Sequence, residues 1–177
     1  MHNEIRRKRR GNEKFPFSLL KKMIIKQQIE ILIQDKFEEH NCFLVELQVG
    51  EGNAISLEID SLDGITVEKC MAFSKAIESE LDREVEDFEL QVSSPGLDKP
   101  FRVAQQYQKN IGRDVKVVPV DGVVVKGELI EVDENGVMVE YSIKEKIEGR
   151  KKKETIVKQE RISFNNIKET TVIISFK

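Results

Sequence analysis

A stiff segment near the middle of the chain constrains the fold more than any other stretch, and it reads VSSPGLDKPF over residues 92–101. An alternating apolar and polar run over 88–92, typical of a half-buried strand, leads into it. Pro95 and Gly96 are typical of a type II turn, with a positive φ expected at the glycine. Pro100 keeps the residue before it out of the helical region. The segment therefore predicts a rigid, extended connection between two folded units.

Charge divides the chain at the same place. The 177 residues are enough for one full domain or two small ones. The formal net charge is +6 over residues 1–22, −12 over 23–97 and +3 over 98–177, for a total of −3. Because nucleic-acid binding depends on neutralising phosphates, the acidic unit is a poor surface for RNA. It suits a basic protein partner, since complementary fields speed encounter and suppress wrong partners.

Three parts are expected along the chain. They are a basic flexible tail over 1–17, an acidic α+β domain over 18–97 and a small β-barrel domain over 98–177. The tail contains the run Arg6 to Arg10, a block of like charge that is typical of a solvated extension. A weak nucleic-acid contact is the alternative interpretation of this run.

The acidic unit has the periodicities of a helix, two strands, a second helix and a third strand. Apolar residues recur at helical spacing from Ile25 to Phe37, and strand-like alternation follows over 43–49 and 55–59. Thr66 is a candidate cap for the second helix. The expected elements cover about 18–39, 43–49, 55–59, 66–82 and 86–92. This order predicts an α+β domain with both helices on one face of a small sheet.

The unit after the connector is predicted to be mostly β. A short helix is expected over 102–110, followed by five short strands up to residue 176. Gly127 stands inside a long strand pattern, which suggests a bulge or a sharp bend. Asn135-Gly136 predicts a hairpin. Five short strands bent by glycine favour a small closed barrel of the SH3-like or Sm-like kind, without open edges.

The sequence contains no recognisable catalytic or metal-binding constellation. His40-Asn41-Cys42 offers at most two ligands where structural zinc takes four, and no nucleophile elbow surrounds Ser93 and Ser94. We therefore expect no enzymatic activity, no cofactor and no metal. No apolar run approaches the ~20 residues of a membrane helix, and no signal-peptide pattern follows the basic start. With only two cysteines, both expected to be free, these features predict a cytoplasmic protein.

Two groups of charged residues are candidates for partner binding. The acidic candidates, which would face a basic protein, are Glu46, Glu58, Asp60 and Asp63. The basic candidates, which would touch an RNA backbone without reading its sequence, are Arg113, Lys116, Arg150, Lys151, Lys152 and Lys153. The last four lie in a charged loop expected over 144–154, and a solvated hairpin tip explains them equally well.

Several motifs together resemble one family. The stretch from Val92 to Pro100 is similar to the V-S-S-P-G-L-D-[RK]-P signature of the RimP family of ribosome maturation factors. Asp60, then Gly64-Ile65-Thr66, with Cys70 and Leu81-Asp82 further on, resembles the family pattern before that signature. The likeness runs from about Met23 to the C-terminus. Residues 1–22 and the basic loop depart from the family, so neither inherits a role.

The resemblance implies a non-enzymatic assembly factor for the small (30S) ribosomal subunit. Such a factor would bind free or immature subunits as a monomer, through a basic ribosomal protein, S12, with 16S rRNA backbone nearby. The signature residues would set the geometry between the domains, and they are Ser93, Ser94, Pro95, Gly96, Leu97, Asp98 and Pro100. Two alternatives stay open: an Sm-like RNA-binding module that acts outside the ribosome, and an enzyme that uses the serine pair.

Overall fold

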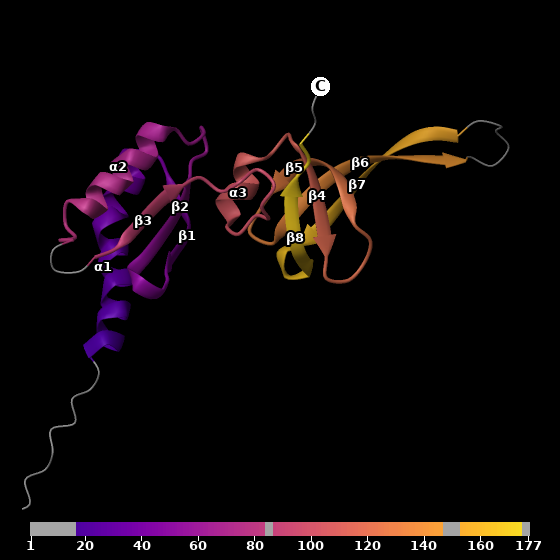
Figure 1. The fold of residues 1–177 in the computed structure, drawn as a ribbon. Coiled ribbons are helices and arrows are strands. Elements are labelled where there is room, and N and C mark those ends of the chain that lie inside the picture. The colour runs from indigo at the N-terminus through magenta and orange to yellow at the C-terminus, as the bar shows by residue number, and fades with distance from the viewer. Residues whose placement is uncertain (1–16, 84–86, 147–152, 175–177) are drawn as a thin grey trace, which may run out of the picture.

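The computed structural model describes residues 17–83, 87–146 and 153–174. The chain forms a helix-and-sheet half followed by a half that is mostly sheet, as the periodicities predict (Figure 1). We refer to residues 17–93 as the first half and to residues 99–174 as the second half. The predicted tail lies outside the described residues except for Phe17, the first residue of the first helix.

The first half has the predicted element order. Its elements are α1 (Phe17–Glu39), β1 (Phe43–Val49), β2 (Ala54–Asp60), α2 (Val67–Glu78) and β3 (Glu89–Ser93). The sheet order is β1-β2-β3, with β1 antiparallel and β3 parallel to the central strand β2. The parallel pair requires a crossover, which α2 supplies. Thr66 caps α2 as predicted, because its Oγ1 accepts a hydrogen bond from the Lys69 N–H at 3.3 Å.

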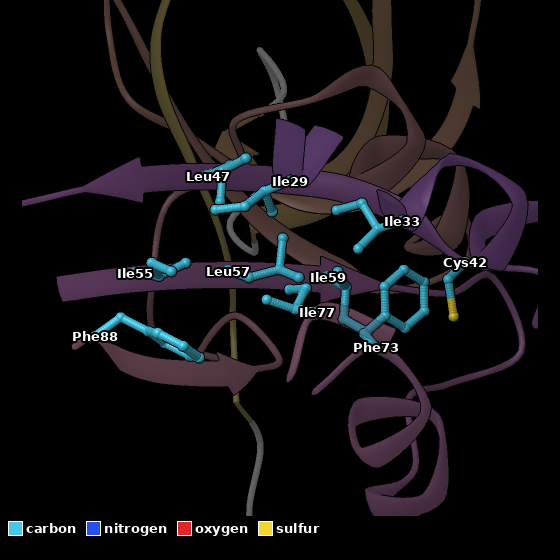
Figure 2. Close-up of a cluster of buried hydrophobic side chains, with 10 residues drawn as sticks. All are labelled: Ile29, Ile33, Cys42, Leu47, Ile55, Leu57, Ile59, Phe73, Ile77 and Phe88. Atoms are coloured by element: carbon cyan, nitrogen blue, oxygen red, sulfur yellow. The ribbon is translucent and has the colours of Figure 1, made fainter. Parts of the chain in front are cut away.

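A hydrophobic core lies between the two helices and one face of this sheet. Figure 2 shows Ile29 and Ile33 of α1 and Phe73 and Ile77 of α2 gathered over Leu57 of the central strand. All five side chains are fully buried. The two residues on each helix are four positions apart, so each helix turns a single apolar stripe to the sheet. The rest of the cluster is Cys42, Leu47, Ile55, Ile59 and Phe88.

The second half begins with a short helix and continues as one antiparallel sheet. Its elements are α3 (Ala104–Lys109), β4 (Asp114–Pro119), β5 (Val125–Val132), β6 (Gly136–Lys146), β7 (Lys153–Ser163) and β8 (Ile167–Val172). A second, separate core forms here from Tyr107, Val115, Val117, Val125, Leu129, Val137, Val139 and Ile162. The two cores fall on either side of the connector.

The prediction of a closed barrel is wrong. The strand order is β7-β6-β5-β4-β8, and within the described residues no pairing joins β7 to β8, so the sheet is open. One reason lies at β8, where the Thr170 carbonyl oxygen accepts a hydrogen bond from the Phe101 N–H at 2.8 Å. The start of the second half therefore occupies β8, and β7 instead extends away with β6 as a long two-stranded ribbon (Figure 1).

The basic loop expected over 144–154 is shorter than predicted. The ribbon pairs Lys144 with Thr155 and Lys146 with Lys153, so both ends of the charged stretch belong to strands. Polar residues occupy both faces of the strands there, so the sequence lacks the apolar–polar alternation that predicts a strand. Of the four predicted basic residues in this region, Lys153 begins β7, and Arg150, Lys151 and Lys152 lie outside the described residues.

Gly127, where the sequence predicts a bulge or a sharp bend, lies where two strands approach closely. A Cβ at this position would lie 2.1 Å from the Glu140 carbonyl oxygen and 2.8 Å from Tyr141 Cβ on the neighbouring strand. The register between β5 and β6 also shifts between Leu129 and Glu131. Only glycine leaves room for β6 at this bend. The predicted hairpin after β5 is present, with the Asp133 carboxylate accepting hydrogen bonds from the N–H groups of Asn135 and Gly136.

Among the residues that the structure describes, we find no helix that is long and apolar enough to cross a membrane.

Candidate functional site at the junction of the two halves

The second face of the central strand β2 is buried although it is charged. Leu57 and Ile59 point into the first core, whereas Glu58 and Asp60 are only 8% and 5% exposed. Glu46 on β1 stands directly across from Glu58 in the sheet register. We call Glu46, Glu58 and Asp60 the junction carboxylates. Buried carboxylates require partners, and here the partners come from the other half of the chain.

Three cations at the start of the second half neutralise this row, and we call Lys99, Arg102 and Lys109 the junction cations. Lys99 Nζ lies 2.6 Å from Glu58 Oε1, and Lys109 Nζ lies 2.6 Å from Asp60 Oδ1. The Arg102 guanidinium contacts Glu46 Oε2 and lies 3.5 Å from Glu58 Oε2. These junction ion pairs join residues 41 to 56 positions apart in the sequence.

Arg102 resolves an electrostatic conflict within the sheet. Like charges that face each other across two strands destabilise the pair, and Glu46 and Glu58 are placed in this way. Lys99 pairs with Glu58 Oε1, and the guanidinium of Arg102 lies near the other oxygen, Oε2, which is buried without a hydrogen bond. The hydrogen bond to Glu58, together with the negative charge of that residue, raises the pKa of Lys99 above its ordinary value. The second half thus supplies the positive charges that the junction carboxylates need in their buried positions.

A cleft of about 260 Å³ opens beside these ion pairs. The connector supplies one wall, with Ser94, Pro95, Gly96 and Leu97. The first half supplies Asp60, Gly64 and Ile65, and the second half supplies Lys99, Phe101, Gln106, Lys109, Asn110, Arg113 and Val172. The cleft therefore exists only where the two halves and the connector meet.

The connector turns at a different place from the one predicted. The φ angle of Gly96 is not positive, so the type II turn at Pro95-Gly96 is wrong. The chain instead turns over 96–99, where the Lys99 N–H donates to the Gly96 carbonyl oxygen at 3.0 Å. The propensity of Pro95-Gly96 for a turn is a local property of the sequence. The ion pair between Lys99 and Glu58 is a non-local contact, and the turn over 96–99 is the one that places Lys99 beside Glu58. Strain from a positive φ therefore cannot be the reason for glycine at 96.

Comparison with known proteins decides the family. Residues 32–98, which include all three junction carboxylates and most of the connector, match the RimP N-terminal domain. The chain is 35% identical over 155 residues to the ribosome maturation factor RimP of Flavobacterium psychrophilum, with 87% of this chain and 100% of the relative aligned. The chain belongs to the RimP family. The RimP of Porphyromonas gingivalis is 35% identical over 152 residues, with 86% of this chain and 100% of the relative aligned. That of Cytophaga hutchinsonii is 30% identical over 164 residues, with 86% and 96% aligned.

The RimP signature and the predicted acidic residues meet at this junction. Ser94, Pro95, Gly96 and Leu97 line the cleft, and Ser93 stands next to Glu58 in the register of β3 against β2. Asp98 lies within the turn over 96–99, and Pro100 leads out of it. Glu46, Glu58 and Asp60 all have cationic partners within the chain, so a basic partner would have to compete for them. Whether they also bind a partner stays a prediction.

Asp63, the fourth acidic candidate, belongs to a separate local network. Its Oδ1 accepts hydrogen bonds from Asn41 Nδ2 at 2.8 Å and from Ser61 Oγ at 3.0 Å, and Lys69 Nζ lies 3.8 Å from Oδ2. The hydrogen bond from Ser61 is the main cause that lowers the pKa of Asp63. This network ties the exit of α1 to the loop before α2, which is a structural role.

The two described basic candidates lie apart. Arg113 lines the cleft, whereas Lys116 on β4 stands directly across from Lys126 on β5, among residues that alternate with the buried Val115 and Val117. Sequence reasoning missed the three junction cations. The available signal was their position, because all three come soon after the strongly acidic unit, which ends at residue 97. Within the described residues, no group of acidic, histidine and cysteine side chains is placed to hold a metal ion.

Proposed function

We propose that this chain is a non-enzymatic assembly factor for the small (30S) ribosomal subunit, acting in the cytoplasm. It binds free or immature subunits, through a basic ribosomal protein such as S12 and through nearby 16S rRNA. The observation that carries this proposal is the likeness to RimP proteins over nearly the whole chain, since these relatives are named ribosome maturation factors.

Charge supports a basic protein as partner. The junction cations neutralise three carboxylates of the first half, but the segment 23–97 carries a net charge of −12. Exposed acidic residues outside the junction include Glu51, Glu68, Glu80 and Glu89. A ribosomal protein rich in lysine and arginine would be attracted to this surface.

The proposed mechanism is preferential binding rather than catalysis. A factor shifts a conformational equilibrium only by its difference in affinity for the two states. The chain stabilises an intermediate arrangement of rRNA and protein, and it dissociates when the mature site forms. Such a mechanism needs a surface of fixed shape, and the junction ion pairs support a defined arrangement of the two halves.

The test is sedimentation of an extract that contains the tagged full-length chain through a sucrose gradient. We expect the chain to migrate with free small subunits and to be absent from complete ribosomes. A charge-reversed variant with Glu51, Glu68, Glu80 and Glu89 changed to lysine should lose most of this association. Equal association with free subunits and complete ribosomes would contradict the proposal. Migration only with RNA outside the ribosome, lost steeply with salt, would instead support the Sm-like alternative.

A further inference from the structure

We propose that the cleft at the junction binds a phosphate group of an RNA backbone, with Arg113 as its main ligand. Arg113 is one of three cations that line the cleft. The other two, Lys99 and Lys109, each lie 2.6 Å from a carboxylate oxygen of β2. Arg113 makes no ion pair with a carboxylate among the residues described, and its Nη1 only reaches Asn110 Oδ1 at 3.4 Å. The residues that line the cleft thus include three cations and one carboxylate, that of Asp60, and an anion would offset this positive charge.

The backbone around Arg113 is held in place without a ligand. Gly112 has a φ of 83°, a conformation that favours glycine, and its N–H donates to the Leu129 carbonyl oxygen at 2.8 Å. The Leu129 N–H donates in return to the Arg113 carbonyl oxygen at 3.0 Å. These bonds fix the Cα of Arg113 to the second sheet. A side chain on a fixed backbone loses less freedom when a ligand binds, which favours affinity.

The chemistry of the cleft suits phosphate. A guanidinium presents its N–H groups in a planar fork that matches two phosphate oxygens. Each lysine ammonium has three N–H donors, so Lys99 and Lys109 keep donors beyond those directed at their carboxylates. A volume of about 260 Å³ is below the ~300 Å³ at which drug-sized ligand sites begin, and it suits one phosphate with part of its sugar. The junction carboxylates do not repel this anion strongly, because the junction cations neutralise them.

The choice of RNA over another phosphate or carboxylate compound rests on the proposed function, in which the chain lies against rRNA. A single phosphate contact contributes modestly, so the effect of removing it should be measurable but limited. Loss of one phosphate contact is expected to weaken binding about equally for every RNA sequence and to reduce the salt dependence by about one unit of slope.

The test measures binding of the full-length chain to a fluorescently labelled single-stranded RNA of twelve nucleotides, by anisotropy over a range of salt concentrations. We expect Arg113→Gln to weaken binding about five- to tenfold and to lower the slope of log K against log salt by about one. The matched control is Lys126→Gln, which removes one exposed cation from β5 and should change affinity less than twofold. Unchanged thermal unfolding shows that both variants are folded.

Three results would overturn the inference. They are equal effects of the two variants, no effect of Arg113→Gln, and no binding of RNA at low salt by the unmodified chain. A glutamate-rich peptide tested in parallel separates the ligand classes. If its binding depends on Arg113 and that of RNA does not, the cleft is a carboxylate site and the proposal is wrong. RNA binding that depends on Arg113, in a chain that fails to migrate with small subunits, would leave this inference standing while the proposed function fails.

Discussion

Gly127→Ala is expected to lower the free energy of unfolding of the second half by about 3 kcal/mol, because the new methyl group has no room. Its carbon would lie 2.1 Å from the Glu140 carbonyl oxygen, a backbone atom held by the ladder between β5 and β6. A flexible side chain could move aside, but this carbonyl can move only if the sheet opens. The strands should therefore separate near Gly127, which lies between the core residues Val125 and Leu129.

Urea denaturation followed by tyrosine fluorescence measures this effect in the second half alone. Both tyrosines of the chain, Tyr107 and Tyr141, lie there. The control in the same half is Val123→Ala, which shortens a side chain that is 83% exposed. That variant should shift the midpoint very little, since surface substitutions of this kind usually stay within about 0.5 kcal/mol. A midpoint for Gly127→Ala equal to that of the control would show that the described approach of the two strands is wrong.

Arg102→Glu is expected to separate the two halves while each stays folded. The substitution places a third carboxylate against Glu46 and Glu58, and the Glu58 side chain is only 10% exposed. An unbalanced charge in a buried site, with a like charge added, should cost about 2–4 kcal/mol of the attraction between the halves. Because each 1.4 kcal/mol is a factor of ten, proteolysis between the halves, within residues 94–98, should become at least tenfold faster.

Two further variants make this test specific to the junction. Lys126→Glu reverses an exposed charge on β5 and should leave the rate of connector cleavage within twofold of the unmodified chain. The combination of Arg102→Glu with Glu46→Arg restores an opposite-charge pair at the junction and should recover part of the protection. If Arg102→Glu is cleaved no faster than the unmodified chain, the junction ion pairs do not hold the halves together.

The local elements of this chain could be predicted because their causes lie close together in the sequence. The stripe from Ile25 to Phe37 places Ile29 and Ile33 in the core, and Thr66 caps its helix through a residue three positions away. Gly127 stands out because a glycine inside a strand pattern usually marks a bulge, a bend or a close approach of two backbones. In each of these three cases, the residues that make up the sequence pattern and the residues they contact belong to one element or to adjacent strands.

The features that were wrong or missed depend on distant contacts. Closure of the second sheet was predicted from strand number and glycine alone, but the Phe101 N–H binds the Thr170 carbonyl oxygen and the sheet stays open. The predicted turn at Pro95-Gly96 lies instead over 96–99, where Lys99 reaches a glutamate 41 positions earlier. The acidic residues of the first unit indicate a surface for another protein. Three of them bind the second half, a pairing that no local pattern encodes.

The most direct test of the account is the ratio of affinities for unfinished and finished small subunits. The labelled full-length chain is titrated with immature small subunits and with mature ones at the same salt concentration, and the two dissociation constants are compared. We expect the chain to bind the immature particle at least tenfold more tightly, which corresponds to about 1.4 kcal/mol of preference for the unfinished state. Equal dissociation constants would contradict the account, since a factor without a preference cannot shift assembly.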